Sequence, residues 1–287
     1  MRNLKSGSLK VLLVLGIQVL GSCYAQKSFT RGEVISSASI EELPEASGLA
    51  PSHVNPGMIW THNDSGDLPR IFLLEPATGR ILSTVYLEGI ENRDWEDIAT
   101  GPGPDGTPYV FIGEIGDNRR VYDKKHIHYF PEPKLNSEVD TIREFGTYSF
   151  NLPDEKRDSE ALTIDPETRD ILLFSKWEPR VVVYKIPFRE GDYGQIETLG
   201  KVGFTLVVAA EISPAGNELL LKTYEYIFLI TREEGQSWAE AILGNSSKSL
   251  PYKVEKQGES ICWDMDAKGY YTLSEQVPEL YYARRSD

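Results

Sequence analysis

Short apolar runs recur along this chain, and Gly, Pro, Asn or Asp bounds each of them. Runs of this length that are rich in β-branched and aromatic residues are typical of strands rather than helices. The runs also follow one another in sets, so that each set predicts several consecutive strands. The second strand of each set is predicted at 58–62, 109–113, 171–175, 219–223 and 270–274, and the third at 70–74, 126–130, 181–185, 227–231 and 280–283.

The first run of each set begins with a glutamate in a similar local setting. Pro51, Pro102 and Pro166 each fall six residues after such a glutamate, where a strand should end in a turn. A repeat of about fifty residues with strand-like content predicts a β-propeller, in which each repeat is one four-stranded blade. The glutamates are Glu45, Glu96, Glu160, Glu211 and Glu259, at intervals of 51, 64, 51 and 48 residues.

The fourth strands decide the number of blades. The fifth repeat ends without one, whereas the unassigned segment 32–40 has strand character and lies just before Glu45. We therefore expect this N-terminal strand to complete the last blade, which leaves no open sheet edge between the first and last blades. The prediction is an all-β, five-bladed propeller; six blades would need a hidden blade in the 64-residue interval. Candidate fourth strands are 80–87, 142–150, 195–204 and 249–254.

The first 25 residues have the pattern of a secretory signal peptide. Three basic residues precede the apolar run 11–20, which is too short to span a bilayer, and small residues follow it. Two processing sites are open: cleavage before Gln26, or lipidation of Cys23 in the lipobox-like segment Leu20-Gly-Ser-Cys23. Either way the product is expected outside the cytoplasm, as a periplasmic, secreted or outer-membrane lipid-anchored protein. Residues 26–287 are then a single propeller domain.

Charge and cysteine content limit the partners. The chain has a formal net charge of −14, and removal of the signal region makes it −17. This acidity argues against nucleic acid and anionic membrane surfaces, so that membrane contact is expected only through a lipid on Cys23. A monomer that binds a small anionic molecule or an extracellular partner is expected. Cys262 is predicted to be a buried structural thiol.

Five carboxylates that converge on the propeller axis would repel one another and would need a counter-charge. Calcium takes six to eight oxygen ligands in flexible geometry and tolerates ligands from separate strands. The sequence therefore predicts a Ca²⁺ site with the five glutamates as candidate ligands. The alternative is that several of them are structural and bind backbone groups of a neighbouring blade.

A second group of polar residues is predicted around one end of the axis. Arg93-Asp94 and Arg157-Asp158 precede their glutamates by three and two residues, and the turns after the second strands add further charges. Such a rim suits an anionic ligand beside a metal, with a carboxylate or histidine as base. Alternatively, Arg93 and Arg157 form only salt bridges with adjacent acids. The candidate catalytic residues are His62, Asp94, Glu114 and Asp158, and the candidate anion-binding residues are Arg93, Arg119, Arg157, Lys176 and Lys222.

Several segments carry a resemblance to known propellers. Glu45-Ala-Ser-Gly-Leu, Trp60-Thr-His-Asn-Asp-Ser-Gly, Arg70-Ile-Phe-Leu-Leu-Glu-Pro and Ser159-Glu-Ala-Leu-Thr-Ile-Asp-Pro resemble repeats of the SdiA-regulated family of exported bacterial proteins and of the esterase-like phytase group. The five-blade layout is also similar to that of calcium-activated nucleotidases (apyrases). This resemblance implies a propeller with a central calcium, and it implies the ligand role for Glu96, Glu160, Glu211 and Glu259, and less directly for Glu45.

Three functions follow from these patterns. The first is an exported calcium-binding propeller that hydrolyses phosphate or related esters at one end of its axis. The second is a non-catalytic propeller that binds a peptide, a glycan or a partner protein. The third is a glycoside hydrolase, for which Trp60, Trp95 and Trp177 are the candidates to stack on sugars. Fold alone does not choose among them.

Overall fold

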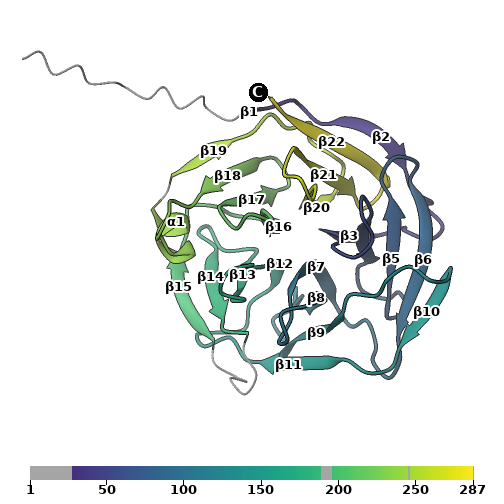
Figure 1. The fold of residues 1–287 in the computed structure, drawn as a ribbon. Coiled ribbons are helices and arrows are strands. Elements are labelled where there is room, and N and C mark those ends of the chain that lie inside the picture. Colours follow the sequence, from purple (N-terminus) through teal and green to yellow (C-terminus); the bar gives the residue numbers. More distant parts are fainter. Residues whose placement is uncertain (1–27, 189–195, 245, 287) are drawn as a thin grey trace, which may run out of the picture.

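Five small sheets stand around one axis in the computed structural model, which describes residues 28–188, 196–244 and 246–286. Figure 1 shows the strands β3, β7, β12, β16 and β20 next to the centre and the later strands of each sheet farther out. The all-β, five-bladed propeller predicted from the sequence is confirmed. The predicted signal peptide and Cys23 lie outside the described residues.

Each blade is an antiparallel sheet whose strands run outward in chain order, apart from the additions described below. The predicted second and third strands all coincide with strands of the structure. Blade one comprises β3 (Ala46–Pro51), β4 (Ile59–Asn63), β5 (Arg70–Glu75) and β6 (Arg80–Leu87), and blade two β7 (Trp95–Pro102), β8 (Pro108–Glu114), β9 (Lys125–Pro131) and β11 (Gly146–Phe150). Blade three comprises β12 (Ser159–Ile164), β13 (Ile171–Ser175), β14 (Val182–Ile186) and β15 (Glu197–Lys201). Blade four comprises β16 (Val207–Ile212), β17 (Glu218–Thr223), β18 (Ile227–Thr231) and β19 (Ser247–Ser249), and blade five β20 (Gly258–Trp263), β21 (Gly269–Ser274) and β22 (Glu279–Ser286).

The long second interval contains an extra strand, and no sixth blade is present among the described residues. The segment β10 (Val139–Ile142) pairs in parallel with β6 and widens blade one to five strands. The fourth strand of blade two is therefore shorter than predicted, because Ile142 belongs to β10 and residues 143–145 connect it to β11. The prediction for blade four was also wrong by several residues, since β19 ends at Ser249 and Pro251 cannot donate to the ladder.

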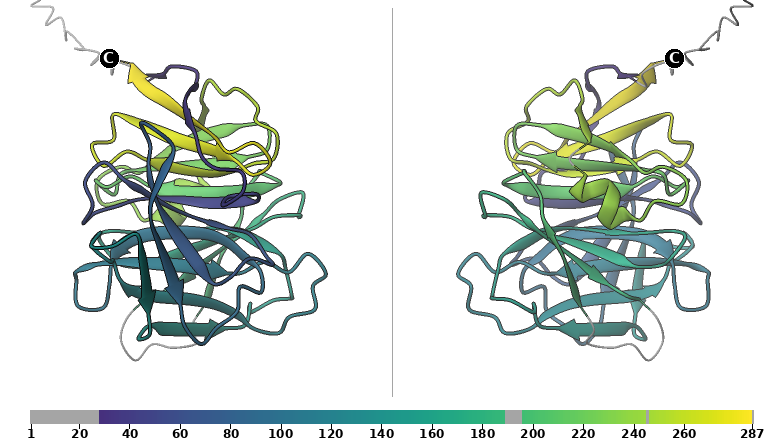
Figure 2. Two further views of the ribbon diagram at one scale, coloured as in Figure 1. Left: turned by 90° about the vertical axis from the view of Figure 1, so that its right-hand side faces the viewer. Right: turned by 90° about the vertical axis from the view of Figure 1, so that its left-hand side faces the viewer.

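The N-terminal strand closes the ring, as the sequence predicted. Strand β2 (Glu33–Ser37) pairs antiparallel with β22, and β1 (Ser28–Phe29) extends the same edge. Arg285 on β22 lies over the ring of Phe29 in β1, which supports this closure, and it also lies over Trp263 and binds Glu218 of blade four at 2.7 Å. The two side views in Figure 2 show β1 and the end of β22 together at one edge of the molecule.

The hydrophobic core is divided among the interfaces between adjacent blades. Strand β13 illustrates the arrangement, because its side chains alternate between the two faces of blade three. Leu172 and Phe174 pack toward blade four, whereas Ile171 and Leu173 pack toward blade two. Both faces of the strand are therefore buried, which explains why the inner strands read as continuous apolar runs. Cys262 is fully buried between blades five and one, as predicted.

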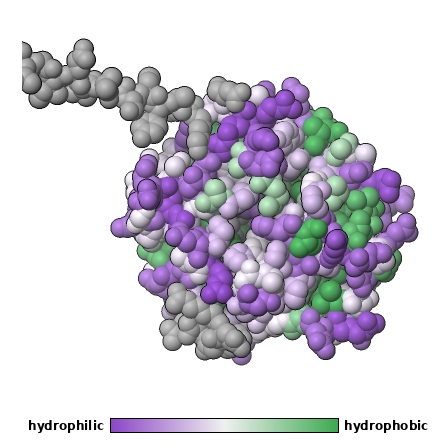
Figure 3. All heavy atoms as spheres, viewed as in Figure 1, coloured by the Kyte–Doolittle hydropathy of each residue, from purple (hydrophilic) through white to green (hydrophobic). Residues whose placement is uncertain are grey.

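One short helix interrupts the strand pattern. Helix α1 (Trp238–Leu243) precedes β19, and its N-terminus has a capping box formed by Ser237 and Glu240. Trp238 and Ile242 pack into the interface between blades three and four. In the described part of the chain, no helix has the length and apolarity needed to cross a membrane. The face shown in Figure 3 is largely hydrophilic, with scattered apolar residues.

Candidate metal centre

A β-bulge near the start of each innermost strand sets the direction of one side chain. The ladder shifts register at this point in all five blades, so that one residue of the inner strand is left unpaired. Bulges re-aim a side chain relative to the sheet. The bulged residue is Gly48 in blade one, Glu96 in blade two, Glu160 in blade three, Val208 in blade four and Glu259 in blade five.

Two of the five predicted ligands, Glu45 and Glu211, do not occupy the bulged position of their strands. Glu45 lies three residues before the bulge of blade one, outside β3, and it is exposed. Glu211 lies three residues after the bulge of blade four. The sequence contained a signal for the correct alignment: Pro214 falls six residues after Val208, as Pro102 and Pro166 do after their glutamates. Alignment on glutamate itself concealed that match.

Glu211 has a structural role in blade four. Its carboxylate accepts a hydrogen bond from the backbone N–H of Trp263 in blade five, and the indole N–H of Trp263 donates to the Glu211 carbonyl at 3.1 Å. Thr163 occupies the equivalent place in blade three and accepts from the N–H of Ile212 at 2.8 Å. This position therefore links adjacent inner strands, which is the structural alternative that the sequence analysis left open.

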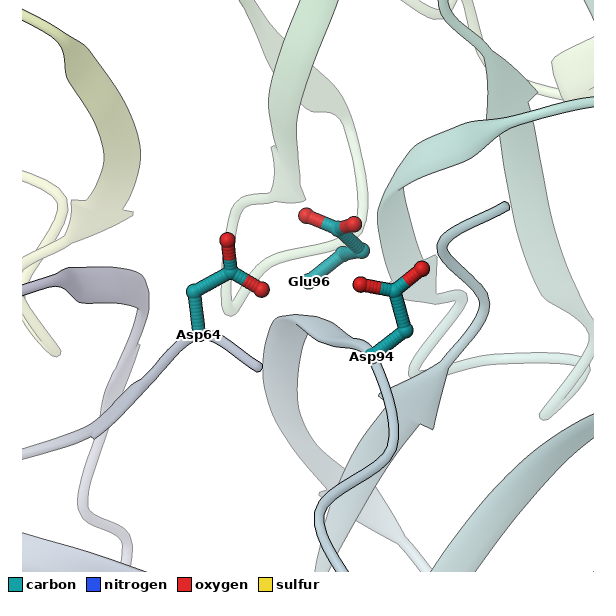
Figure 4. A group of neighbouring side chains, drawn as sticks. All are labelled: Asp64, Asp94 and Glu96. Carbon is teal, nitrogen blue, oxygen red and sulfur yellow. The ribbon is translucent and has the colours of Figure 1, made fainter. Parts of the chain in front are cut away.

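The other glutamates lie near further acids at the end of the axis where β7 and β12 begin. Asp64 follows β4, while Asp94 and Asp158 each precede a bulged glutamate by two residues. Two groups share Glu96: Asp64, Asp94 and Glu96, and Glu96, Asp158 and Glu160. Within each group, one carboxylate oxygen from every residue lies within 4.8 Å of the others. We call these five residues the acidic cluster; Figure 4 shows the carboxylates of its first group pointing toward one another.

Neighbouring groups hold the second half of the acidic cluster in place. The Asp158 carboxylate accepts from the backbone N–H of Asp117 and from the indole N–H of Trp177, each at 2.7 Å. The Lys176 ammonium donates to Glu160. Asp158, Glu160 and Glu96 are each at most 3% exposed. Because fixed, buried carboxylates cannot turn away from one another, their charge must be balanced in place.

Gly116 gives the acidic cluster the space it occupies. A Cβ atom on this residue would lie 2.1 Å from Oε1 of Glu96 and 2.5 Å from Oδ2 of Asp94. A larger residue would therefore displace both carboxylates. The glycine lies in the turn that follows Glu114 at the end of β8, and the sequence analysis assigned it no role.

The electrostatics of the acidic cluster favour protons or another cation. Burial, followed by repulsion from Asp94 and other acids, raises the pKa of Asp64 to about 7. Burial and Asp158 raise the pKa of Asp94 to about 6. The pKa of Glu96 is held well above its usual value by burial, then by Glu160 and Asp64. Glu259 lies close enough to raise the pKa of Asp64, and its carboxylate accepts from the hydroxyl of Tyr224.

Two lysines supply part of the balancing charge. Burial lowers the pKa of Lys176, but the Glu160 carboxylate outweighs this and holds it above its usual value. Burial lowers the pKa of Lys125 to about 8 despite the nearby acids, and its ammonium donates to the Ile115 carbonyl. The sequence analysis missed Lys125, which directly precedes the predicted third strand of blade two. Arg93 also opposes the effect of burial on the pKa of Asp94, and Lys222 lies near Glu259.

The remaining anion-binding candidates are engaged elsewhere. Arg157 is buried and binds Asp154 at 2.9 Å, Glu178 at 2.7 Å and Glu155. Lys222 is fully buried and donates to the carbonyls of Thr223 and Gly258, and burial lowers its pKa to about 8. Arg119 is exposed on the turn after β8. The contacts of Arg157 are therefore those of the alternative given above, in which it forms salt bridges with nearby acids.

His62 and Glu114 lie outside the acidic cluster. His62 is fully buried, its Nδ1 donates to the Asn63 carbonyl at 2.9 Å, and its ring meets Trp95 edge-on. Burial lowers the pKa of His62 to about 4, so the imidazole is neutral and enclosed. Glu114 lies in a separate cleft together with Arg93. The structure therefore brings together Asp94 and Asp158 from the predicted catalytic set, but not His62 or Glu114.

The three candidate tryptophans differ in their access to a ligand. Trp60 and Trp95 are fully buried between blades one and two, so neither ring is available to stack on a sugar in this structure. Trp177 is 48% exposed beside Asp158. No protein-family model matches the chain, and no curated protein matches it.

Proposed function

We propose that this protein is an exported calcium-binding propeller whose metal lies in the acidic cluster. The observation that carries the proposal is that two carboxylate triads share Glu96, with ligand oxygens within 4.8 Å of one another in each triad. These acids outnumber the two nearby lysines, and three of the five are almost completely buried. A cation at Glu96 would balance charge that Lys125 and Lys176 leave uncompensated.

Calcium matches the donors better than other common metals. All five members of the acidic cluster offer carboxylate oxygens, which are the preferred ligands of calcium and magnesium. The donors come from three separate connections and two inner strands, and calcium tolerates such irregular geometry, whereas magnesium demands a near-ideal octahedron. Zinc favours histidine and cysteine, which neither triad contains.

The first experiment is to measure the metal content of the purified mature protein and its melting curve with and without chelator. We expect about one calcium per chain and a melting temperature that falls in chelator and recovers when calcium is restored, since a ligand of the native state adds stability by mass action. Equal melting curves in chelator and in calcium, with no metal bound, would contradict the metal site and mean that the acidic cluster has only a structural role.

Hydrolysis of phosphate or related esters is a second candidate function. The observation that favours it is Asp64, a partly exposed carboxylate at the edge of the acidic cluster, where a substrate held by the metal would meet a candidate general base. Bound calcium would polarise a phosphoryl oxygen. The test is phosphate release from a panel of phosphate esters in calcium, with Asp64→Asn as the variant. Tight calcium binding without hydrolysis of any ester would favour the non-catalytic alternative.

The glycoside hydrolase alternative has weaker support. Its acid and base need to stand roughly 5 to 9.5 Å apart with a sugar between them. The oxygens of each triad come closer together than that, which suits a metal ion better than a sugar ring.

Export is proposed from residues 1–25 alone. The intact mass of the mature protein tests it, because cleavage before Gln26 and lipidation of Cys23 give different masses, whereas an uncleaved chain contradicts it.

A further inference from the structure

A second cluster of chemically active side chains lies on the face of blade two that is turned toward blade one. It faces a cleft of about 670 Å³ between the β6–β7 connection and the strands β9 and β11. None of the five acids proposed to hold calcium lines this cleft. Its lining includes Arg93, Glu114, His126, His128, Thr147 and Ser149.

The strand register places these side chains in one array. His126 and His128 are two residues apart on β9, so both point to the same face of the sheet. Ser149 and Thr147 lie directly opposite them on β11. Glu114 lies directly opposite His126 on β8. The two imidazole rings are nearly parallel, with centroids 6.2 Å apart and an angle of 17° between the planes.

Each histidine is oriented by a hydroxyl group. Nδ1 of His126 is hydrogen-bonded to the Ser149 hydroxyl at 2.7 Å, and Nδ1 of His128 to that of Thr147 at 2.9 Å. When Nδ1–H donates to the hydroxyl, the lone pair of the neutral ring is on Nε2. This arrangement is the one found for metal-binding histidines, in which the second ring nitrogen is fixed by an outer hydrogen bond.

Both Nε2 atoms approach the same carboxylate. Nε2 of His128 lies 3.6 Å from one oxygen of Glu114, and Nε2 of His126 lies 4.0 Å from the other. His128 is only 3% exposed, and its Nε2 is buried without a hydrogen-bond partner. A buried nitrogen that makes no hydrogen bond loses the free energy of its solvation by water, and only a bound ligand would compensate for that loss. The atom therefore points to a missing partner at this place.

We propose that His126, His128 and Glu114 form a zinc site that is independent of the calcium site. Zinc binds nitrogen and oxygen at about 2.0 to 2.2 Å, so neighbouring ligand atoms around one ion lie roughly 3.3 Å apart. In the structure Nε2 of His128 and of His126 lie 3.6 and 4.0 Å from the two Glu114 oxygens, so zinc binding requires both rings and the carboxylate to turn toward a common centre. Three protein ligands leave a fourth position open toward the cleft, which is the arrangement of exchangeable and catalytic zinc sites rather than of closed structural ones.

Arg93 takes the place of the metal charge in the structure described here. Its guanidinium lies 3.1 Å from Glu114, and it also donates to the Lys124 carbonyl at 3.2 Å and stacks on the ring of Tyr122. These other contacts hold Arg93 when the carboxylate turns to the metal. Arg93 and zinc therefore compete for Glu114, and removal of the arginine should strengthen zinc binding.

The test is titration of the full-length mature protein with zinc chloride by calorimetry, with calcium present at saturation to occupy the acidic cluster. We expect one zinc per chain and an affinity that falls by more than about a hundredfold in His128→Gln and in His126→Gln, since loss of an outer hydrogen bond alone typically costs about tenfold to a hundredfold. Thr147→Val should weaken binding less, and Arg93→Met should strengthen it. His53→Gln is the matched control, because His53 is exposed and does not line the cleft.

Two results would overturn the zinc site. One is an unchanged zinc affinity in the double variant of His126 and His128, with folding verified by its melting curve. The other is loss of zinc binding in Glu96→Gln but not in His128→Gln, which would locate the ion in the acidic cluster. X-ray absorption at the zinc edge gives an independent measurement, since the proposed site requires scattering from two imidazole rings.

Discussion

Glu96 and Glu211 are two buried glutamates on inner strands that perform different tasks. Both are less than 10% exposed, and burial raises the pKa of both. Glu96 lies in the bulge of its strand and joins the two carboxylate triads. Glu211 lies three residues beyond the bulge and accepts a backbone hydrogen bond from the next blade. The position of a residue relative to the bulge, rather than its type, therefore determines its role.

The largest expected effect is that of Glu96→Gln on calcium. Calcium at about a hundred times its Kd should add about 2.7 kcal/mol to the stability of the native protein, and loss of the shared ligand should remove this contribution. In chelator the same variant should melt at or above the wild-type temperature, because one repelling charge is gone. Calorimetric melting curves in calcium and in chelator measure both quantities.

A variant that still gains the full calcium-dependent increase in melting temperature would show that Glu96 is not a ligand. The difference between the two conditions guards against a simple folding defect, which would lower both melting temperatures together.

Glu211→Ala should have a smaller effect of a different kind. The backbone N–H of Trp263 loses its acceptor in a fully buried place, which costs roughly 2 kcal/mol of unfolding free energy. Calcium affinity should not change, since Glu211 belongs to neither triad. Chemical denaturation gives the free energy, and calcium titration gives the affinity.

Glu211→Gln is the control for that substitution, because the amide oxygen still accepts from Trp263 and most of the stability should return. A calcium affinity that falls in Glu211→Ala as far as in Glu96→Gln would erase the distinction between the two glutamates.

The fold also contains features that the sequence predicted and others that it did not. Strand periodicity predicted the five blades and the closure by β2, because buried strands leave strong apolar runs between turn residues. The four-residue strand β10 was missed, because its exposed sequence Val-Asp-Thr-Ile has no buried face to give a pattern. Its pairing with β6 depends on a distant edge that local sequence does not encode.

The candidate site was predicted in part for a similar physical reason. Asp94 and Asp158 repeat at a fixed offset from their glutamates, so the spacing revealed them. Asp64 lies in the connection after β4 and Lys125 at the start of β9, and only the folded chain brings them to Glu96. Gly48 and Val208 occupy ring positions without a carboxylate, which a search for repeated glutamates cannot find.

The smallest expected effect is a pH dependence of stability, which should involve the acidic cluster around Glu96 but not Glu211. Asp64 and Asp94 have folded pKa values of about 7 and 6, above their unfolded value of 3.8, so the metal-free native state binds more protons than the unfolded chain between about pH 4 and 7. The contribution of these groups to stability in chelator should therefore decrease as pH rises through this range. Calcium needs the ionised carboxylates, so its stabilising effect should increase over the same range.

Melting curves at pH 5 and pH 8, each with and without calcium, measure both slopes. The calcium-dependent increase in melting temperature should be clearly larger at pH 8, and Glu96→Gln should flatten this dependence. Glu211→Ala should keep it, because the carboxylate of Glu211 faces a backbone N–H rather than the acidic cluster. A calcium effect of equal size at both pH values would mean that the ion binds to carboxylates with ordinary pKa values. The metal would then have to be sought among exposed acids, away from Glu96.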